Sequence, residues 1–331
     1  MQEKNSLNSQ KKNCALIIDS TNTFLRGYAS NMAMNDYGDH VGGVVSYLYT
    51  LKNFISSVYT GVNAVCCVWD GPDGSVRRRG ICKEYKNGRK PPKPKNRFYQ
   101  DRQESNSAEQ QNMLIETLQC LPVRQFALSG VEADDVIAYI VGKIKHDFNV
   151  VILSTDHDYY QLVAPNVVIY NPVKKKFMKE QDIIKEHSIH PTNFALARSV
   201  IGDKTDNLQG INGIGYKTLA KYFPNFKERE FYTLSSLYEE AKKFDKPTKT
   251  LLKMIDGYGI IERNMKLMRL DHTLLNDSQK QEVECDMKEP VTSERYCLKN
   301  VIFRHGLHIN SEALFDSTLP LLAHGTDLIP Q

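Results

Sequence analysis

Short apolar runs alternate with segments of helical periodicity over the first ~175 residues of the chain. The apolar runs, most of them rich in β-branched residues, lie at 14–18, 64–69, 123–128, 149–154 and 166–170. Helical periodicity occupies 41–59, 105–120 and 132–146. Such runs are typical of strands covered on both faces, and their alternation with helices is typical of parallel sheets. The pattern therefore predicts an α/β fold with a mostly parallel central sheet flanked by helices.

The strand signal fades after about residue 178, and the rest of the chain is mainly helical in pattern. Apolar residues recur at helical spacing in 192–201, 214–223, 236–244 and 246–270. We therefore predict an α/β domain over 13–185 and a helical region over 186–331, after a polar tail (1–12) expected to be disordered. Residues 272–295 are polar and are expected to be irregular, and the last dozen residues are expected to fray.

Carboxylates follow three of the predicted strands directly. Asp19 ends the first run, Asp70 ends the second, and Asp156 and Asp158 come after the fourth. Ligands of open parallel sheets bind outside the carboxyl ends of the strands, so these acids should converge at one edge. Asp156 and Asp158 are two apart, which in extended backbone points both the same way. His157, between them, is expected to point away.

A second group of acids begins helices: Glu132, Asp134 and Asp135 in one segment, Asp203 and Asp206 in another. Any one acid at such a position can be a cap or turn residue. Nine gathered at one edge would repel each other and take up protons unless cations relieve them. Ligands that are all oxygen favour Mg²⁺ or Mn²⁺ over Zn²⁺. The nine acids therefore predict a site for two divalent ions.

The remainder of the chain is basic. The formal net charge is only +4, but without the nine acids 43 basic residues face 30 acidic ones, a net charge of +13. Residues 77–97 hold ten Lys and Arg against one acid, Glu84. A basic, proline-rich run can be a solvated linker or a targeting patch. Its position directly after Asp70 favours a segment that attracts a polyanion.

A glycine-rich turn at 202–223 offers a second contact for phosphate. Gly213 and Gly215 open a predicted helix, so free backbone N–H groups can hold a phosphate, with Lys217 beside them. Glycines also serve ordinary helix-to-helix turns, so the pair alone is weak evidence. Its proximity to Asp203 and Asp206 in the sequence connects this turn to the predicted metal site.

The cysteines and the amino terminus indicate a reduced, cytoplasmic protein. The seven cysteines are odd in number and none has CxxC spacing, so neither a zinc site nor a disulfide framework is expected. Residues 1–13 lack the apolar core of a signal peptide. The longest uncharged stretch is too polar for a membrane span, so no membrane partner is expected.

Taken in order, these segments resemble the 5′ nucleases of phages and bacteria. That family includes phage flap endonucleases, phage 5′-exonucleases of the RNase H type and the 5′ nuclease domain of DNA polymerase I. The resembling segments cover about 17–223 and are IIDSTN, VWDG, EYKNGRKPPKP, EADD, STDHDYYQLV and GDKTDNLQGINGIGYKTLAKY. The tail carries no polymerase or proofreading motif, so a freestanding nuclease is expected.

The resemblance implies a PIN-like nuclease domain, a helix-hairpin-helix at 202–223 that grips duplex DNA, and a helical arch from 77–100 that passes a single-stranded 5′ end. Matched by motif, one metal ion would be served by Asp19, Asp70, Glu132, Asp134 and Asp135. The other would be served by Asp156, Asp158, Asp203 and Asp206. The catalytic side chains at the scissile phosphate would be Lys86 and Arg89. Nucleic acid would be contacted by Arg78, Arg79, Lys83, Tyr85, Gly213, Gly215 and Lys217, and K⁺ is a further candidate ligand of the helix-hairpin-helix.

The implied activity is Mg²⁺-dependent hydrolysis of phosphodiesters near a 5′ end by a two-metal mechanism, with 5′-phosphorylated products. The substrate would be branched or nicked DNA, or an RNA–DNA duplex, with a single-stranded 5′ end. The role would be removal of RNA primers or flaps in replication, in a bacterial cell or a phage-infected host. The chain is expected to be a monomer, with a replication clamp or single-strand binding protein as candidate partner. Two alternatives are a non-catalytic binder of branched DNA and a PIN-type single-strand ribonuclease.

Overall fold

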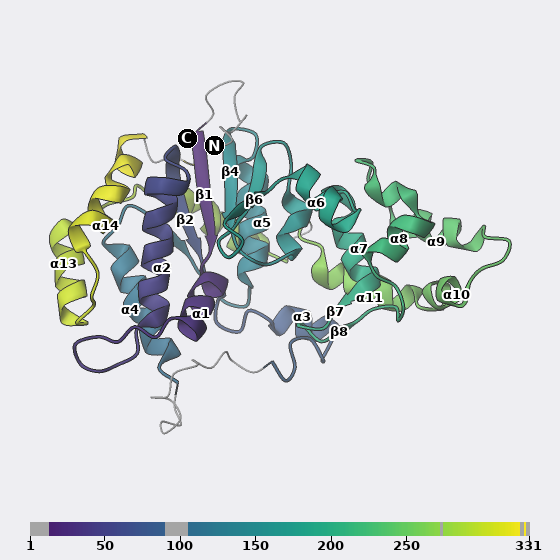
Figure 1. Cartoon of the computed structure of the whole chain (residues 1–331), viewed down its shortest axis with the longest axis horizontal. Coiled ribbons are helices and arrows are strands. Elements are labelled where there is room, and N and C mark those ends of the chain that lie inside the picture. Colours follow the sequence, from purple (N-terminus) through teal and green to yellow (C-terminus); the bar gives the residue numbers. More distant parts are fainter. Residues whose placement is uncertain (1–12, 90–104, 272–273, 325–327, 329–331) are drawn as a thin grey trace.

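The computed structural model describes residues 13–89, 105–271, 274–324 and 328. The predicted tail at 1–12 and the arch residues 90–100 lie outside these ranges. Within the described residues, no helix is both long and apolar enough to cross a membrane. Figure 1 shows a central sheet with helices on both sides and a helical extension, α7 to α11, at one end.

The centre of the molecule is a six-stranded sheet in the order β3-β2-β1-β4-β5-β6. Its strands are β1 (Asn13–Asp19), β2 (Val62–Val68), β3 (Arg124–Phe126), β4 (Phe148–Leu153), β5 (Val167–Asn171) and β6 (Lys176–Met178). All neighbouring pairs are parallel except β5 and β6. The predicted mostly parallel α/β sheet is therefore confirmed, and the antiparallel edge strand β6 was not predicted.

Both faces of the sheet are buried, as the continuous apolar runs require. In β1, Ala15 and Ile17 pack into one hydrophobic cluster, while Leu16 and Ile18 pack into a second cluster on the opposite face. This division follows from the alternation of side chains along a strand. Because helices cover both faces, loops at the carboxyl ends of the strands are the part of the sheet open to a ligand.

The helices account for most of the remaining chain. They are α1 (Ser20–Ser30), α2 (Gly42–Asn53), α3 (Val76–Ile81), α4 (Ser107–Gln119), α5 (Ala133–Ile144), α6 (Glu180–His187), α7 (Phe194–Ile201), α8 (Tyr216–Tyr222), α9 (Leu234–Lys242), α10 (Lys249–Asp256), α11 (Tyr258–Met268), α12 (Asp277–Lys288), α13 (Arg295–Arg304) and α14 (Ser311–Thr318). Within the region predicted to be an arch, α3 is helical and the segment from Lys83 to Gly88 is built from turns.

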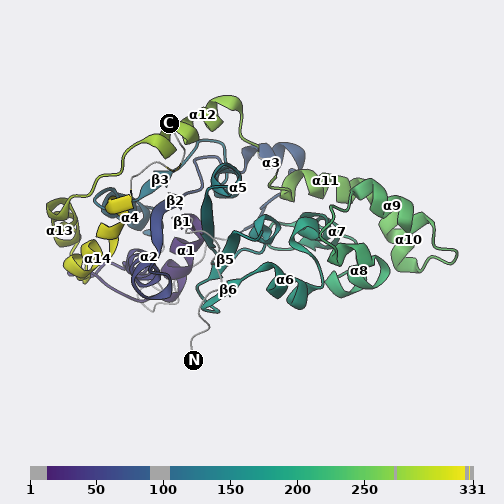
Figure 2. The same ribbon diagram turned by 90° about the horizontal axis from the view of Figure 1, so that it is seen from above.

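The C-terminal helices return to the nuclease-like α/β body rather than extending the helical end. Helix α12 packs on β3 and α5, α13 on α4, and α14 on α2, and Figure 2 shows α12 crossing between the two ends of the molecule. The prediction of an irregular 272–295 segment is wrong, because α12 occupies much of it. Val283 and Met287 are the buried residues that hold this otherwise polar helix in place.

One cysteine pair departs from the expected reduced state. Cys120, at the end of α4, is joined by a disulfide to Cys297 of α13, 177 residues further along the chain. Among the other cysteines, Cys14, Cys66, Cys67 and Cys82 are free and buried, and Cys285 is free and exposed. The return of α13 onto α4 creates the pair, and sequence spacing carries no signal for a contact so distant.

Candidate functional site

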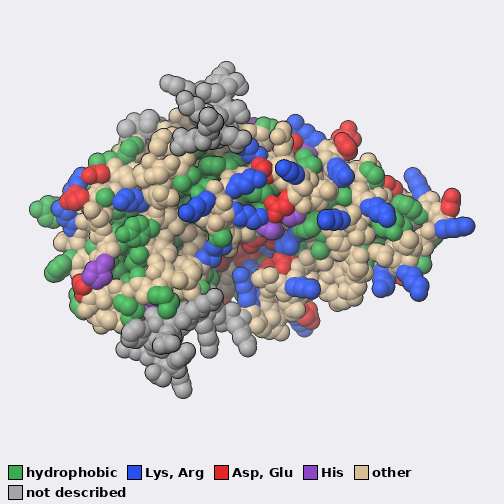
Figure 3. Space-filling model, viewed as in Figure 1, with side chains coloured by type: hydrophobic (Ala, Val, Ile, Leu, Met, Phe, Trp, Pro, Cys, Tyr) green, Lys and Arg blue, Asp and Glu red, His purple; other side chains and the backbone are tan. Residues whose placement is uncertain are grey.

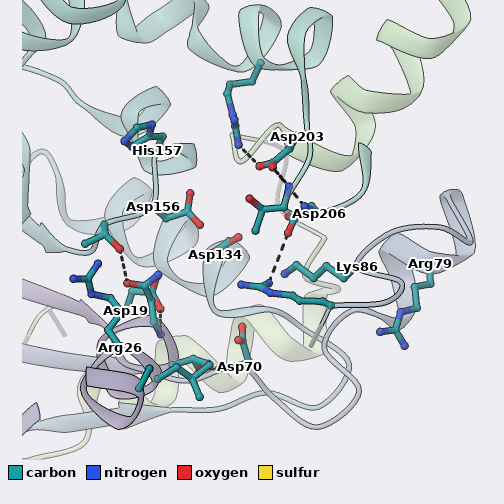
Figure 4. Close-up of a pocket in the computed structure, with 18 residues that line it drawn as sticks. Asp19, Arg26, Asp70, Arg79, Lys86, Asp134, Asp156, His157, Asp203 and Asp206 are labelled. Carbon is teal, nitrogen blue, oxygen red and sulfur yellow. Dashed lines mark hydrogen bonds and ion pairs between the residues drawn. The ribbon is translucent and has the colours of Figure 1, made fainter. Parts of the chain in front are cut away.

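Six of the nine predicted acids line one cavity of about 910 Å³ at the carboxyl edge of the sheet. They are Asp19, Asp70, Asp134, Asp156, Asp203 and Asp206. Figure 4 shows their side chains turned toward a common space, and Figure 3 shows acidic side chains inside a hollow with Lys and Arg around it. The expected convergence of these acids is thus present in the structure. The prediction that Asp203 and Asp206 begin a helix is wrong, because they lie at the turn between β7 (Gly202–Asp203) and β8 (Leu208–Gln209).

Backbone and hydroxyl donors orient the acids at the strand ends. Asp19 caps α1, accepting from the Asn22 N–H at 3.1 Å and from the Ser154 hydroxyl at 3.0 Å. Asp70 accepts from the Ala133 N–H at 2.8 Å, at the start of α5. Each carboxylate keeps a second oxygen or a free lone pair that can face the cavity. These hydrogen bonds therefore position the acids and leave them able to bind a ligand.

The acids that follow β4 form a compact turn. The Asp158 N–H donates to Asp156 Oδ1 at 2.9 Å, so the two carboxylates are not simply parallel as extended backbone would place them. The Tyr159 hydroxyl donates to Asp134 at 2.6 Å and to Asp19 at 3.3 Å, bridging α5 and β1. His157 is among the residues that line the cavity, but Figure 4 shows its ring turned away from the acids, as expected. Its ring stacks on Tyr160 with centroids 4.7 Å apart.

Asp158, Asp203 and Asp206 form the tightest carboxylate group in the described part of the chain, with ligand atoms within 4.8 Å of one another. Arg198 of α7 lies beside this group, pairing with Asp158 at 2.9 Å and also with Asp203. Asp203 additionally accepts from the Thr205 N–H at 2.7 Å. Arg198 therefore supplies a counter-charge that the sequence analysis did not assign.

Glu132 and Asp135 sit differently from the other predicted metal ligands. Both are buried, and neither lines the cavity. Arg78, itself buried, pairs with Glu132 at 2.9 Å and with Asp135 at 2.6 Å. Lys86 pairs with the other Glu132 oxygen at 2.7 Å. The structure thus separates these two acids from the cavity group, and a metal role for them stays a prediction.

The basic residues between Arg77 and Arg89, the described part of the basic segment, differ in burial. Lys86, Arg89 and Arg79 line the cavity, and Arg89 lies 3.7 Å from Asp206. Lys83 is exposed. Arg78 and Tyr85 are each 3% exposed, and the Tyr85 hydroxyl donates to Glu132 at 2.9 Å. Their burial contradicts the prediction that Arg78 and Tyr85 contact nucleic acid, because their polar atoms face inward.

The turn at 202–223 has the geometry that its glycines predict. Gly213 has a φ of +89°, a left-handed conformation that L side chains rarely adopt. A Cβ on Gly210 would lie 2.0 Å from the Ile201 carbonyl oxygen, so only glycine allows this close approach. Gly215 directly precedes α8, and Lys217 in the first turn of that helix is exposed. Phosphate or K⁺ binding at this turn stays a prediction.

Burial and mutual repulsion raise the pKa values of several carboxyls at this site. Burial, followed by the charges of Asp134 and Asp70, raises the pKa of Asp19 to about 7. Burial also raises the pKa of Asp158 to about 6, and burial together with the Asp158 charge raises that of Asp156. Asp203 is the exception: burial alone would raise its pKa, but the Arg198 guanidinium holds it below its usual value.

The donor set fits hard divalent cations. The acids offer only oxygen ligands, and burial raises the pKa values of Asp19, Asp158 and Asp206, as expected for carboxylates that nearby cations neutralise only in part. Mg²⁺ and Mn²⁺ prefer such oxygens, and the one imidazole among the lining residues, His157, stacks on Tyr160. The residues that would hold metal are Asp19, Asp70, Asp134, Asp156, Asp158, Asp203 and Asp206.

Comparison with known proteins assigns the chain to a family. Residues 14–189, just over half of the chain, match the family model described as 5′-3′ exonuclease, N-terminal resolvase-like domain. The chain belongs to this family of 5′ nucleases. A 5′-3′ exonuclease from Buchnera aphidicola subsp. Schizaphis graminum is 23% identical over 296 residues, which are 89% of this chain and 94% of that relative. The flap endonuclease Xni of Shewanella sp. (strain MR-4) is 28% identical over 264 residues, 78% of this chain and 90% of that one.

Solved structures of the family share the fold. A bacteriophage T5 flap endonuclease, in a pseudo-enzyme-product complex with DNA and metal ions, aligns with a TM-score of 0.61. It is 19% identical, and the alignment covers 92% of this chain and 99% of that one. At this identity the likeness concerns the fold alone.

Two arginines of the site escaped the sequence analysis. Arg26 of α1 and Arg198 of α7 both line the cavity. Arg26 and Arg198 stand alone in apolar helical patterns, where a single arginine is usually a surface residue. A signal existed for Arg198, since it lies five residues before Asp203 on a short helix that ends at the acidic turn.

Proposed function

We propose that this chain is a divalent-metal-dependent 5′ nuclease that hydrolyses phosphodiesters near the 5′ end of branched or nicked DNA, or of RNA–DNA duplexes. The observation that carries the proposal is the cavity in which six carboxylates from separate parts of the chain are gathered with Lys86 and Arg89. This many carboxylates can bind divalent metal ions, and the side chains of Lys86 and Arg89 beside them can bind a phosphate. Supporting it, the T5 relative is named as a flap endonuclease complexed with DNA and metal ions.

In the proposed reaction, a pair of Mg²⁺ or Mn²⁺ ions would supply an activated water and would stabilise the leaving oxygen. The chain's own residues hold the reacting groups. The seven aspartates would bind the ions, with Asp19 and Asp134 kept in place by Tyr159. Lys86 and Arg89 would neutralise charge that develops on the phosphate. The products would carry 5′-phosphates.

The duplex part of the substrate would be held by the 202–223 turn and by exposed basic residues such as Lys83 and Lys217. Removal of RNA primers or 5′ flaps in replication, in the cytoplasm of a bacterial or phage-infected cell, is the role we propose. We further propose that the chain acts as a monomer, with a replication clamp or single-strand binding protein as partner and K⁺ at the turn.

The direct test is cleavage of a 5′-labelled flap duplex, with a nicked RNA–DNA hybrid alongside, in Mg²⁺, in Mn²⁺ and in EDTA. We expect short 5′ products with either metal and none in EDTA, and their lengths would distinguish flap cutting from stepwise trimming. Tight binding without cleavage in both metals would replace this function with the non-catalytic binder. Cleavage of single-stranded RNA alone would favour the PIN-type ribonuclease.

Lys86→Ala should slow cleavage by about 10²- to 10³-fold, with only a modest loss of duplex affinity, because it removes a charge that acts on the phosphate in the transition state. Single-turnover rates and binding titrations on the flap duplex measure the two effects separately. Lys83→Ala, in the same segment but exposed, is the control and should weaken binding without slowing turnover. Equal losses of rate and affinity in Lys86→Ala would show that Lys86 contributes to substrate binding only.

Metal should stabilise the protein more at high pH than at low pH. The Asp19 and Asp158 pKa values, about 7 and about 6, lie above the value near 3.9 expected in the unfolded chain. The folded state therefore binds extra protons below pH 7, and the metal-free protein loses stability as the pH rises through this window. Binding of Mg²⁺ at about 100 times its Kd would add about 2.7 kcal/mol. Thermal unfolding should show a Tm rise with Mg²⁺ at pH 8 that shrinks at pH 5.5; equal rises would contradict the site.

A further inference from the structure

Glu132 is held from three sides by donors of a single segment. Its Oε1 accepts from Lys86 Nζ at 2.7 Å. Its Oε2 accepts from the Tyr85 hydroxyl at 2.9 Å and lies 2.9 Å from Arg78 Nη1. Glu132 and Tyr85 are each 3% exposed, and Arg78 is equally buried. A buried carboxylate with this many partners has its orientation fixed.

Lys86 is fixed at its backbone as well as at its ammonium group. Its φ of +52° is a left-handed conformation that costs a non-glycine residue free energy. Its N–H donates to the carbonyl oxygen of Asp206 at 2.9 Å, which ties it to one of the cavity acids. The surrounding contacts thus hold Lys86 in a position that its own backbone does not favour.

Arg78 connects this arrangement to two further parts of the molecule. Its Nη1 donates to Asp135 at 2.6 Å, and its Nε donates to the Leu267 carbonyl oxygen near the end of α11 at 2.9 Å. The other Asp135 oxygen accepts from the Leu274 N–H at 3.3 Å. Helix α3, the start of α5 and the chain after α11 therefore meet at one guanidinium.

We propose that Arg78 and Tyr85 are positioning residues for Lys86 and act on it through Glu132. Neither side chain lines the cavity, so neither reaches a substrate there. Arg78 and Tyr85 both hold Oε2 of Glu132, and Glu132 in turn holds the ammonium group of Lys86 beside the acids through Oε1. This proposal rests on the proposed nuclease function, in which Lys86 meets the phosphate.

The alternative role for the same contacts is purely structural, with Arg78 and Tyr85 maintaining the fold at the base of α3. The two roles differ in one measurable way. A positioning effect requires Lys86, whereas a structural effect is independent of it. A double-mutant cycle separates them, since residues that act through one another are not additive.

The experiment measures single-turnover cleavage of the 5′-flap duplex by the full chain, Tyr85→Phe, Lys86→Ala and the double variant, with thermal unfolding of each. Tyr85→Phe removes one buried hydrogen bond to a charged group and should slow cleavage about tenfold, with KM changed less than about twofold. In the Lys86→Ala background the same substitution should change the rate less than about twofold. Arg78→Lys should behave like Tyr85→Phe, because a lysine cannot reproduce the forked geometry.

Tyr139→Phe is the matched control, because it also removes a tyrosine hydroxyl bonded to a carboxylate, Glu284 at 2.6 Å, and neither residue lines the cavity or contacts Glu132. It should leave the rate unchanged. A Tyr85→Phe effect of equal size with and without Lys86 would overturn the proposal, as would no effect in either background.

A second measurement keeps the proposal separate from the proposed function. Trace acetylation by acetic anhydride, followed by mass spectrometry, reports how freely the Lys86 amine reacts. Tyr85→Phe and Arg78→Lys should raise labelling of Lys86 several-fold relative to Lys83 in the same segment. Increased labelling without any wild-type cleavage would refute the nuclease function and leave the positioning intact. Unchanged labelling would refute the positioning, whatever the activity.

Discussion

Asp70→Asn and Asp156→Asn should each reduce cleavage of a 5′-flap duplex by about 10³-fold or more while duplex binding survives. Both carboxylates line the cavity, and each supplies a negative charge that an amide lacks. Divalent cations contribute several kcal/mol of charge stabilisation to hydrolysis of this kind, which corresponds to a loss of that order. Cleavage rates in Mg²⁺ and binding titrations in Ca²⁺-free EDTA buffer measure the two properties separately.

The two substitutions are informative because they preserve the local hydrogen bonds. Asp70 Oδ1 accepts from the Ala133 N–H, and Asp156 Oδ1 accepts from the Asp158 N–H. An asparagine carbonyl oxygen can accept the same bonds, so the turns should keep their shape. Duplex affinity should stay equal or rise slightly, since a negative charge facing phosphates is removed.

Asp277→Asn is the matched control. Asp277 begins α12, and its side chain is 96% exposed and distant from the cavity acids in sequence and fold. This variant should cleave like the unmodified chain. Normal turnover in Asp70→Asn and Asp156→Asn would remove these aspartates from the site, and loss of binding together with cleavage would indicate a folding defect.

The sequence was sufficient to predict the sheet and most of the acidic cavity. Burial on both faces forces continuous apolar strands, and parallel strands place their carboxyl ends at one edge. Asp19, Asp70 and Asp156 therefore converge for a reason that local sequence already contains. Asp134 joins them because α5 begins at the same edge, whereas Asp203 and Asp206 reach the cavity from the turn that follows α7.

Contacts between distant segments were beyond prediction from local pattern. The three consecutive arginines at 77–79 looked equivalent, yet Arg78 is buried and Arg79 is exposed. That difference depends on where α3 packs against α5 and α11, which periodicity does not specify. For the same reason Tyr85 was predicted to stack on a base, although its hydroxyl faces Glu132.

The C-terminal helices illustrate a related limit. Helix α12 is polar in composition, and only Val283 and Met287 are buried. Two apolar residues on a charged helix carry too weak a periodic signal to predict either the helix or its partner. Its place against α5 and β3 is determined by tertiary contacts, among them the Arg124 bond to the Glu289 carbonyl oxygen at 2.8 Å.

Arg78→Met should lower the free energy of unfolding by about 3–5 kcal/mol, the loss typical when one member of a buried ion pair is removed. Asp135 and Glu132 would lose their shared guanidinium, and the Leu267 carbonyl oxygen would lose its donor. Lys86 and Tyr85 still donate hydrogen bonds to Glu132, so most of the lost stability should come from the unpaired charge of Asp135. Urea-induced unfolding in EDTA measures the change without a contribution from metal.

The origin of that loss can be tested within the same pair. Combining Arg78→Met with Asp135→Leu removes the stranded charge, and it should recover a large part of the stability, since apolar replacements of buried pairs are often neutral. Arg79→Met, at the exposed neighbouring position, should change stability by less than about 0.5 kcal/mol. A double variant no more stable than Arg78→Met would instead attribute the loss to the Leu267 contact. If the double variant recovers stability but not cleavage, Arg78 has two separate effects. It stabilises the fold through Asp135, and it positions Lys86 through Glu132.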